Sequence, residues 1–427
     1  MGRRLPTVPR AVVNYVADGK RSTPINRAAG RVIVSALMLL KLVRYDWGVI
    51  EQWPRPLTTS YWPFTAEIIS THLPAIAFVT GIALVGVLVG YRLRVLGFVA
   101  AVGLTYLGTV RLAHDPSHGS DILFIGAIFV LFFALFAEED KLSIDQLRRT
   151  RSMRLDALTD HLEASRETTD ERRYSHSALK WSLALVGVMY FHAAVGKLRG
   201  APLEWIQPTN LGRFIVYRQF AYDLPLPAGE LLLQVPLLLT MAAIGTILLE
   251  GSILPAIALR QRIDVLFAGL VGMHATIAFA VGPIFTDLVV LLLAFVSWDL
   301  IHGWLQRDRD LAVVYDSRCF LCARSLHLFG FLDVRGNVTF YDQESVPDRL
   351  AQQEDINLER SMYVFGEGDR YRGYEAFRAL FAQFGLSVVI SWIMGLPGIR
   401  FIGRRVYRHV VAHRSRYFVC AVDPDLE

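Results

Sequence analysis

The sequence predicts a polytopic α-helical membrane domain of about eight spans, followed by a small α/β domain. Hydrophobic residues make up 53% of the 427 residues and charged residues only 19%, a composition too apolar for a soluble protein of this length. Long apolar runs separated by basic segments continue as far as residue 303. From residue 311 the runs become short and rich in β-branched residues, as in strands. We therefore expect two units with different folds.

The net charge indicates which kinds of partner to expect, and the number of cysteines excludes one class of fold. The formal net charge of +5 is modest, and in so apolar a chain it is typical of cytoplasmic loops and lipid contact. The three cysteines, two of them in the motif CFLC, are too few for a fold held together by disulfides. We expect the lipid bilayer as a partner and no nucleic acid.

Residues 1–30 form a basic leader. They lack a short apolar core followed by a cleavage site of small residues, so we expect a cytoplasmic N-terminus without a cleaved signal. The first span is predicted at about 32–50, where Lys41, Arg44 and Asp46 interrupt the apolar run. Charges inside a span are tolerated only where they face protein or a water-filled cavity.

Seven further apolar runs are long enough to be spans. They are predicted at about 73–90, 95–112, 121–137, 178–196, 229–249, 263–281 and 285–303. The segment 51–72 fits an external loop, 138–176 fits a charged cytoplasmic loop with helical character, and 201–227 is amphipathic. Counting the spans alternately places the basic loops, both termini and the α/β domain on the cytoplasmic side. Whether 251–259 lies in the membrane stays open.

The stretch from Leu179 to Gly200, LKWSLALVGVMYFHAAVGKLRG, carries the clearest candidate site of the membrane domain. It is an apolar run with His192 inside it and Lys197 near its end. Ionisable groups at that depth are costly, so they indicate a functional site. Simpler interpretations stay open: Lys197 can extend its ammonium group to the lipid headgroups, and His192 can fill a polar gap between helices.

The segment YFHAAVGKLRGAPLEW resembles a motif of the HTTM family, the bacterial relatives of vitamin K-dependent gamma-carboxylase. The resemblance covers about 31–303 within a predicted membrane domain of 31–305. It implies an integral protein of a bacterial-type plasma membrane that binds a vitamin K-like quinone. It also implies that Lys197 is the base that deprotonates the reduced quinone. The positions that it implies near the cofactor are Tyr190, His192, Asp121, Glu250 and His274.

Two of these positions have further interpretations. Glu250 ends a predicted span on the cytoplasmic side, opposite Lys197, where a carboxylate can simply face the headgroups. His274 lies in the middle of a span, where an unpaired imidazole is disfavoured. We therefore expect His274 to bond a neighbouring side chain or a ligand.

The α/β domain opens with the apolar run LAVVYD, followed by SRCFLC. Cys319 and Cys322 are three residues apart, so on the first turn of a helix their sulfur atoms face the same way and can form a disulfide. A helix N-terminus favours the thiolate form of the leading cysteine. Asp316 lies just before the motif and can either carry a proton or oppose that thiolate. The alternatives are two ordinary buried cysteines or half of an irregular zinc site.

A strand, a CxxC motif at the start of a helix, and then further strands and helices are the layout of a thioredoxin-like α/β domain. The later strands are predicted at 337–342 and 361–368 and a helix at 374–384. The motifs VVYDSRCFLC, SMYVFGEGDRYRGYEAFRAL and RRVYRHVVAHR resemble the DCC family of thiol-disulfide oxidoreductases over about 311–415. The resemblance leaves a tail at 416–427. Unlike ordinary thioredoxins, the chain has no proline directly before the strand at 361.

The stretch 386–419 contains a brief apolar run, LSVVISWIMGL, and then the basic GRRVYRHVVAHRSR. Eleven apolar residues are too few to cross a bilayer. We therefore expect an interfacial helix with cationic flanks.

These features predict an integral-membrane oxidoreductase-like enzyme that joins a quinone-handling helical domain to a thiol-disulfide module. Lys197 would act as the base, and Cys319 and Cys322 would form a redox-active disulfide. The expected partners are a small-molecule quinone and a protein thiol. The alternative is a non-catalytic membrane scaffold or lipid-binding protein with a CxxC redox module. A transporter is a third interpretation, but the chain shows no internal repeat that favours it.

Overall fold

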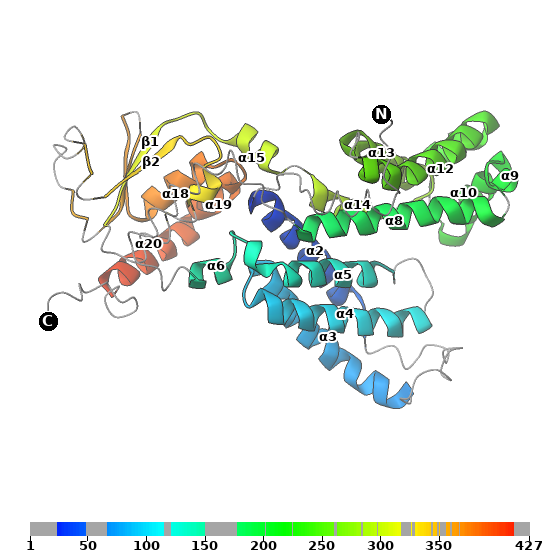
Figure 1. Ribbon diagram of the computed structural model, residues 1–427, viewed down its shortest axis with the longest axis horizontal. Coiled ribbons are helices and arrows are strands. Elements are labelled where there is room, and N and C mark those ends of the chain that lie inside the picture. Colours follow the sequence, from blue (N-terminus) through cyan, green and yellow to red (C-terminus); the bar gives the residue numbers. More distant parts are fainter. Residues whose placement is uncertain are drawn as a thin grey trace, which may run out of the picture. The chain divides into compact units, whose positions relative to one another are not determined.

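The structure of the protein is a computed structural model, drawn in Figure 1. It describes residues 24–47, 66–114, 121–149, 177–200, 202–223, 225–259, 263–282, 285–296, 298–316, 326, 329–342, 345–347, 350, 356–358, 361–366 and 368–413. The chain divides into two compact units, and each is described by itself. The first falls within 27–139 and 173–296, and the second takes in 140–172, 297–427 and the very start of the first described helix.

The first unit is helical throughout its described part. Its elements are α2 (Pro24–Arg44), α3 (Ala66–Val89), α4 (Leu93–His114), α5 (Asp121–Leu135), η3 (Ala137–Glu139), α8 (Ser177–Gly200), α9 (Pro202–Trp205), α10 (Pro208–Tyr222), α11 (Pro227–Leu233), α12 (Pro236–Leu259), α13 (Ile263–Ala280), α14 (Thr286–Leu292) and η5 (Leu293–Phe295). In Figure 1, α3, α4 and α5 run side by side, and α8 lies along α12. Fully buried leucines and phenylalanines of α4 and α5 form the centre of the apolar core.

Small residues set the spacing of the packed helices. A Cβ atom on Gly97 of α4 would overlap Ala134 of α5, and one on Gly187 of α8 would overlap Ile257 of α12. Close approach of this kind is what small residues provide in membrane helix packing.

The long apolar helices are compatible with a membrane protein. Among the described residues, four helices are long and apolar enough to cross a bilayer, namely His72–Val89, Leu93–Leu112, Ala178–Arg199 and Pro236–Leu259, and the number rises to as many as six if each of two broken helix pairs counts as one span. The eight predicted spans are therefore not confirmed. The runs predicted at 121–137 and 263–281 form shorter apolar helices, Ile122–Leu135 and Val265–Ala280.

The predicted span at 32–50 differs from α2, which starts earlier and ends at Arg44. Lys41 faces protein, as the cost of a charge in a span requires, and pairs with Asp287 at the start of α14. Arg44 is the last residue of α2 and Asp46 lies beyond the helix, and both are exposed. Arg31 of α2 donates to the carbonyls of Val87 and Leu88 at the end of α3, so this basic group also has internal partners.

The sixth predicted span, 229–249, is also displaced. Residues Pro227–Leu233 form the separate α11, and α12 begins at Pro236 and continues through 251–259 to Leu259. Proline has no N–H to donate but fits the first turn of a helix, so Pro236 starts α12. The segment 251–259 thus belongs to the long apolar helix.

The second unit contains the α/β module. Its elements are α6 (Ile144–Arg149), α15 (Trp298–Leu305), β1 (Leu311–Val314), β2 (Val338–Tyr341), β3 (Tyr363–Phe365), β4 (Arg370–Arg372), α18 (Tyr374–Gln383), η6 (Gly385–Ser387), α19 (Val388–Gly395) and α20 (Pro397–Ala412). The four strands form one sheet in the order β2-β1-β3-β4. Strands β1 and β2 are parallel, with Leu311 opposite Val338, and β3 is antiparallel to both β1 and β4.

Helix α18 packs on β3 and β4, and α19 and α20 pack in turn on α18 (Figure 1). Ala376, Leu380 and Phe384 are completely buried together with Phe329. The strands and the helix expected at 337–342, 361–368 and 374–384 are confirmed by β2, β3 and α18. Strand β4 escaped prediction because it has three residues, two of them exposed arginines.

The last predicted span, 285–303, does not form one continuous helix. Its second half, α15, packs on the α/β module. His302 bonds the carbonyl of Leu332 at 2.8 Å, and Gln306 just beyond α15 donates to Asp333 at 2.7 Å. These polar contacts make α15 part of the second unit.

Candidate functional site

Helix α8 carries two of the predicted site residues on one face. Tyr190 and Lys197 are seven residues apart, about two turns of an α-helix, so both side chains point the same way. Ala194 lies between them on this face and is buried against Gly251 of α12. His192 is five residues from Lys197, about 140° around the helix axis, and its side chain is exposed. The structure therefore brings Tyr190 and Lys197 together and leaves His192 outside.

Lys197 forms an ion pair with Glu250 of α12. The distance between Nζ and Oε2 is 2.5 Å, and the two side chains are 17% and 8% exposed. The expectation that Glu250 lies opposite Lys197 at a span end is wrong. Because α12 runs from Pro236 to Leu259, Glu250 lies in the helix interior and reaches Lys197.

Tyr190 and His274 form a second pair in the same unit. The hydroxyl of Tyr190 lies 2.7 Å from Nε2 of His274, a hydrogen bond between α8 and α13. The ring of Phe285 lies 5.5 Å from the imidazole ring. The prediction that His274 bonds a neighbouring side chain is confirmed. Its other ring nitrogen, Nδ1, is buried without a hydrogen-bond partner among the described residues.

The two pairs make one polar cluster, which we define as Tyr190, Lys197, Glu250 and His274. The charge of Lys197 acts on His274, and that of Glu250 acts on Tyr190. Three helices supply the four side chains. A cluster that contains an ammonium group, a carboxylate, a phenol and an imidazole can donate and accept protons and can bind oxygen atoms of a ligand.

One residue beside the cluster was not among the predicted site residues. The ring centre of Trp205, at the end of α9, lies 5.0 Å from Nζ of Lys197, a cation–π contact. Its signal in the sequence was the tryptophan that follows the lysine in GKLRGAPLEW. The ring covers the ammonium group and supplies an apolar wall.

The structure describes Asp121 and the cysteine motif only in part. Asp121 is the first residue of α5, but its side chain lies outside the described residues, as do Cys319 and Cys322. Asp316 follows β1 and is buried at 6% exposure. Leu326 and residues 329–332 are helical, as expected downstream of the motif. Within the described ranges, no group of three or more His, Cys, Asp or Glu could hold a metal ion.

A groove of about 550 Å³ lies elsewhere in the first unit, between α10, α11 and α12. Its lining includes Arg213, Tyr217 and Leu239 but none of the cluster residues. The groove is therefore not part of the candidate site.

The two units define the class of protein: a mostly helical chain with several membrane-compatible helices and a small α/β module that contains a four-stranded sheet. Within this class, residues 313–420 match the model of the DCC1-like thiol-disulfide oxidoreductase family. The match confirms the DCC resemblance and supports a redox module with thiol-disulfide oxidoreductase activity. No curated protein and no solved structure matches the chain.

Proposed function

We propose that the protein is an integral-membrane oxidoreductase that combines a quinone-handling helical unit with a thiol-disulfide module. The observation that carries the proposal is the polar cluster of Tyr190, Lys197, Glu250 and His274, which three helices bring together within a largely apolar unit. Ionisable groups are expensive in such surroundings and are retained where they do chemistry. The resemblance of 31–303 to the HTTM family supports the same interpretation.

In the proposed reaction, Lys197 is the base. Proton transfer from the Lys197 ammonium group to Glu250 converts the ion pair into a neutral carboxylic acid and a neutral amine, and the neutral amine is the form that can act as a base. The amine then takes a proton from a quinol hydroxyl, which leaves a quinolate and restores the ammonium group. Nδ1 of His274 and the hydroxyl of Tyr190 are suited to hold the quinone oxygens, and Trp205 is suited to contact the ring.

The second half of the proposal concerns the module. The strand order β2-β1-β3-β4, with a parallel pair followed by antiparallel strands, supports a thioredoxin-like arrangement. We place Cys319 as the attacking thiolate, Cys322 as the resolving thiol and Asp316 as a proton carrier. A dithiol that becomes a disulfide releases two electrons and two protons, the amount that reduces one quinone to its quinol. The thiol-disulfide module and the proposed quinone site therefore exchange the same number of electrons and protons.

We further propose that both termini and the CxxC module are cytoplasmic, in a bacterial-type plasma membrane. The basic segments at 1–31, 92–94, 141–173, 260–262 and 307–309 support this orientation. In intact cells, a membrane-impermeant thiol reagent should leave Cys319 and Cys322 unmodified and should label them once the cells are opened. Ready labelling of intact cells would reverse the orientation.

The experiment on the helical unit uses the full chain in nanodiscs. First, small molecules that copurify are extracted and identified by mass spectrometry, and a quinone is expected. A naphthoquinol is then titrated in, and its quinolate is followed by absorbance. Lys197→Met should bind the quinol without forming quinolate, and Lys197→Arg should also fail because guanidinium stays protonated. Lys141→Met, a lysine replaced in the second unit, is the matched control and should behave as the wild type.

Two results would contradict the proposal in different ways. Quinolate formation by Lys197→Arg would remove the role of Lys197 as base while leaving quinone binding in place. If apolar replacements of Lys197 and His274 leave binding and turnover unchanged, the alternative of a non-catalytic scaffold or lipid-binding protein is favoured.

A further inference from the structure

Helices α19 and α20 form a bent pair on the outside of the α/β module. The eight residues of α19 and the sixteen of α20 meet at Pro397 with a bend of 94°. The sequence predicts an interfacial helix here, but it does not say which face is free. The contacts of α20 with α18 settle that question.

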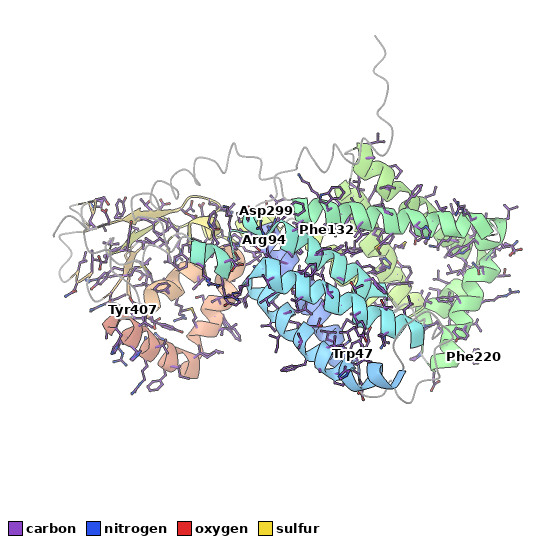
Figure 2. All side chains as sticks on the ribbon, turned by 60° about the horizontal axis from the view of Figure 1, so that its bottom comes forward. Trp47, Arg94, Phe132, Phe220, Asp299 and Tyr407 are labelled. Atoms are coloured by element: carbon purple, nitrogen blue, oxygen red, sulfur yellow. The ribbon has the colours of Figure 1, made fainter. Side chains whose placement is uncertain are left out.

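One face of α20 is fixed to the module. Gly403 packs so closely on the ring of Tyr374 that a Cβ atom would overlap it. Tyr407, labelled in Figure 2, makes an edge-on contact with Phe377 at 6.0 Å between ring centres. Arg404 reaches Glu375 of α18. These positions recur every three or four residues, so they form one helical face.

The remaining surface of both helices exposes several large apolar side chains. On α19, Val389, Trp392 and Ile393 are 57%, 69% and 41% exposed, while Ser391 on the opposite side is buried. On α20, Ile399, Ile402 and Val406 continue as an exposed stripe at helical spacing, and no residue of α20 is buried. Apolar side chains that are exposed on two successive helices indicate an interaction surface.

Positive charge borders this apolar surface. Arg405 and Arg408 are exposed on α20, whereas Arg400 and Arg404 already share Glu375. The sequence from 385 to 412 contains no aspartate or glutamate. Apolar side chains flanked by uncompensated arginines complement a bilayer with anionic headgroups, because the apolar groups enter the interface and the guanidinium groups meet the phosphates.

The geometry also opposes a membrane-crossing role for these helices. Eight residues of α19 extend about 12 Å, well short of the roughly 30 Å hydrocarbon core. Helix α20 contacts α18 between Arg400 and Tyr407 and cannot leave the module without breaking those contacts. A helix that keeps one face on the module can present only its other face to lipid.

We propose that the outer face of α19 and α20 docks the redox module on the anionic surface of a bilayer. The apolar side chains would enter the headgroup region, and Arg405 and Arg408 would bind lipid phosphates. This docking would hold the module at a defined height above the membrane. It is independent of quinone chemistry and of the role of Lys197.

The test places spin labels in the full chain reconstituted in nanodiscs. The three native cysteines are replaced by serine, and single cysteines are introduced as Trp392→Cys or Ile402→Cys. Power saturation with oxygen and a water-soluble nickel chelate reports the depth of each label. With phosphatidylglycerol in the bilayer, both labels should lie at headgroup depth. A label at Val334→Cys, an exposed apolar position elsewhere in the module, should stay in water.

The lipid and charge controls decide the outcome. In pure phosphatidylcholine, or with Arg405→Gln and Arg408→Gln, the ratio of docked to undocked label should fall about 30-fold. Removal of the same number of arginines from β4, by Arg370→Gln and Arg372→Gln, should have little effect.

Three results would overturn the inference. Labels that stay in water in every lipid would show that the outer face of α19 and α20 does not contact the bilayer. Labels protected equally in detergent and in every lipid would show that protein covers this face. Labels at the centre of the bilayer, at a depth independent of lipid charge, would show that the helices enter the membrane instead of lying on it.

Discussion

Removal of one partner of the Lys197–Glu250 ion pair should destabilise the protein far more than removal of both. The two side chains are only 17% and 8% exposed, so little water reaches a charge that loses its partner. Breaking a buried pair from one side costs about 3–5 kcal/mol, whereas replacing the whole pair by apolar residues of similar volume is often neutral. We expect Lys197→Met and Glu250→Leu each to lower the free energy of unfolding by about 3 kcal/mol.

The double variant should lie within about 1 kcal/mol of the wild type, since methionine and leucine refill the volume without leaving a charge. The coupling energy of the double-mutant cycle should therefore be several kcal/mol. Unfolding of the full chain is measured in mixed micelles by titration with a denaturing detergent, and circular dichroism follows the loss of helix. The same double variant should be stable but unable to form quinolate, which separates stability from function.

An exposed pair in the same unit serves as the matched control. Arg94 and Glu138 lie 2.6 Å apart, but their side chains are 62% and 67% exposed. Exposed pairs contribute about 0–1 kcal/mol, so Arg94→Met should have a small effect. If Lys197→Met costs no more than Arg94→Met, water screens the Lys197–Glu250 pair and the reasoning from burial is refuted.

The other predictions concern the second unit. Cys322→Ser should trap a mixed disulfide with a thiol partner and Cys319→Ser should trap none, because the leading cysteine attacks and the second resolves the mixed disulfide. Non-reducing gels with mass spectrometry detect the trapped species. The reverse pattern would make Cys322 the attacking cysteine and Cys319 the resolving one. Burial alone raises the pKa of Glu375, but hydrogen bonds from two arginines of α20 outweigh it and hold the pKa below its ordinary value of 4.5. The stability from this carboxylate is present above pH 4.5 and is lost as the pH falls through the lowered pKa. The protection factors of the α20 amides, which correct the exchange rate for its intrinsic pH dependence, should therefore fall in acid, and in Glu375→Gln they should be low at every pH; equal acid sensitivity in that variant would contradict the assignment. Finally, a Cβ on Gly385 would overlap the carbonyl oxygen of His302, while Gly398 has open space around it. Gly385→Ala should thus lower the free energy of unfolding, measured by thermal unfolding, by about 1–3 kcal/mol. Gly398→Ala should lower it by much less, and equal effects of the two variants would argue against the contact.

Much of the local structure was predictable because it depends on neighbours in the chain. The strands at β1, β2 and β3 and the helix α18 follow from short apolar runs and helical spacing. Helix ends were harder, since a run of apolar residues does not mark where a helix breaks. Pro236 divides α11 from α12, and the contacts of His302 draw α15 onto the α/β module.

The sequence by itself determined which residues are candidates and how those on one helix relate. Tyr190 and Lys197 are seven positions apart, which places both on one face of α8, whereas His192 is five positions from Lys197, which places it on another face. Only the tertiary structure decided their partners. Glu250 is 53 residues from Lys197, and His274 is 84 residues from Tyr190. The periodicity of a helix sets the direction of its side chains around its own axis, but not the depth or rotation at which a second helix packs against it. That depth and rotation depend on which side chains pack together between α8 and α12. This packing brings Lys197 next to Glu250.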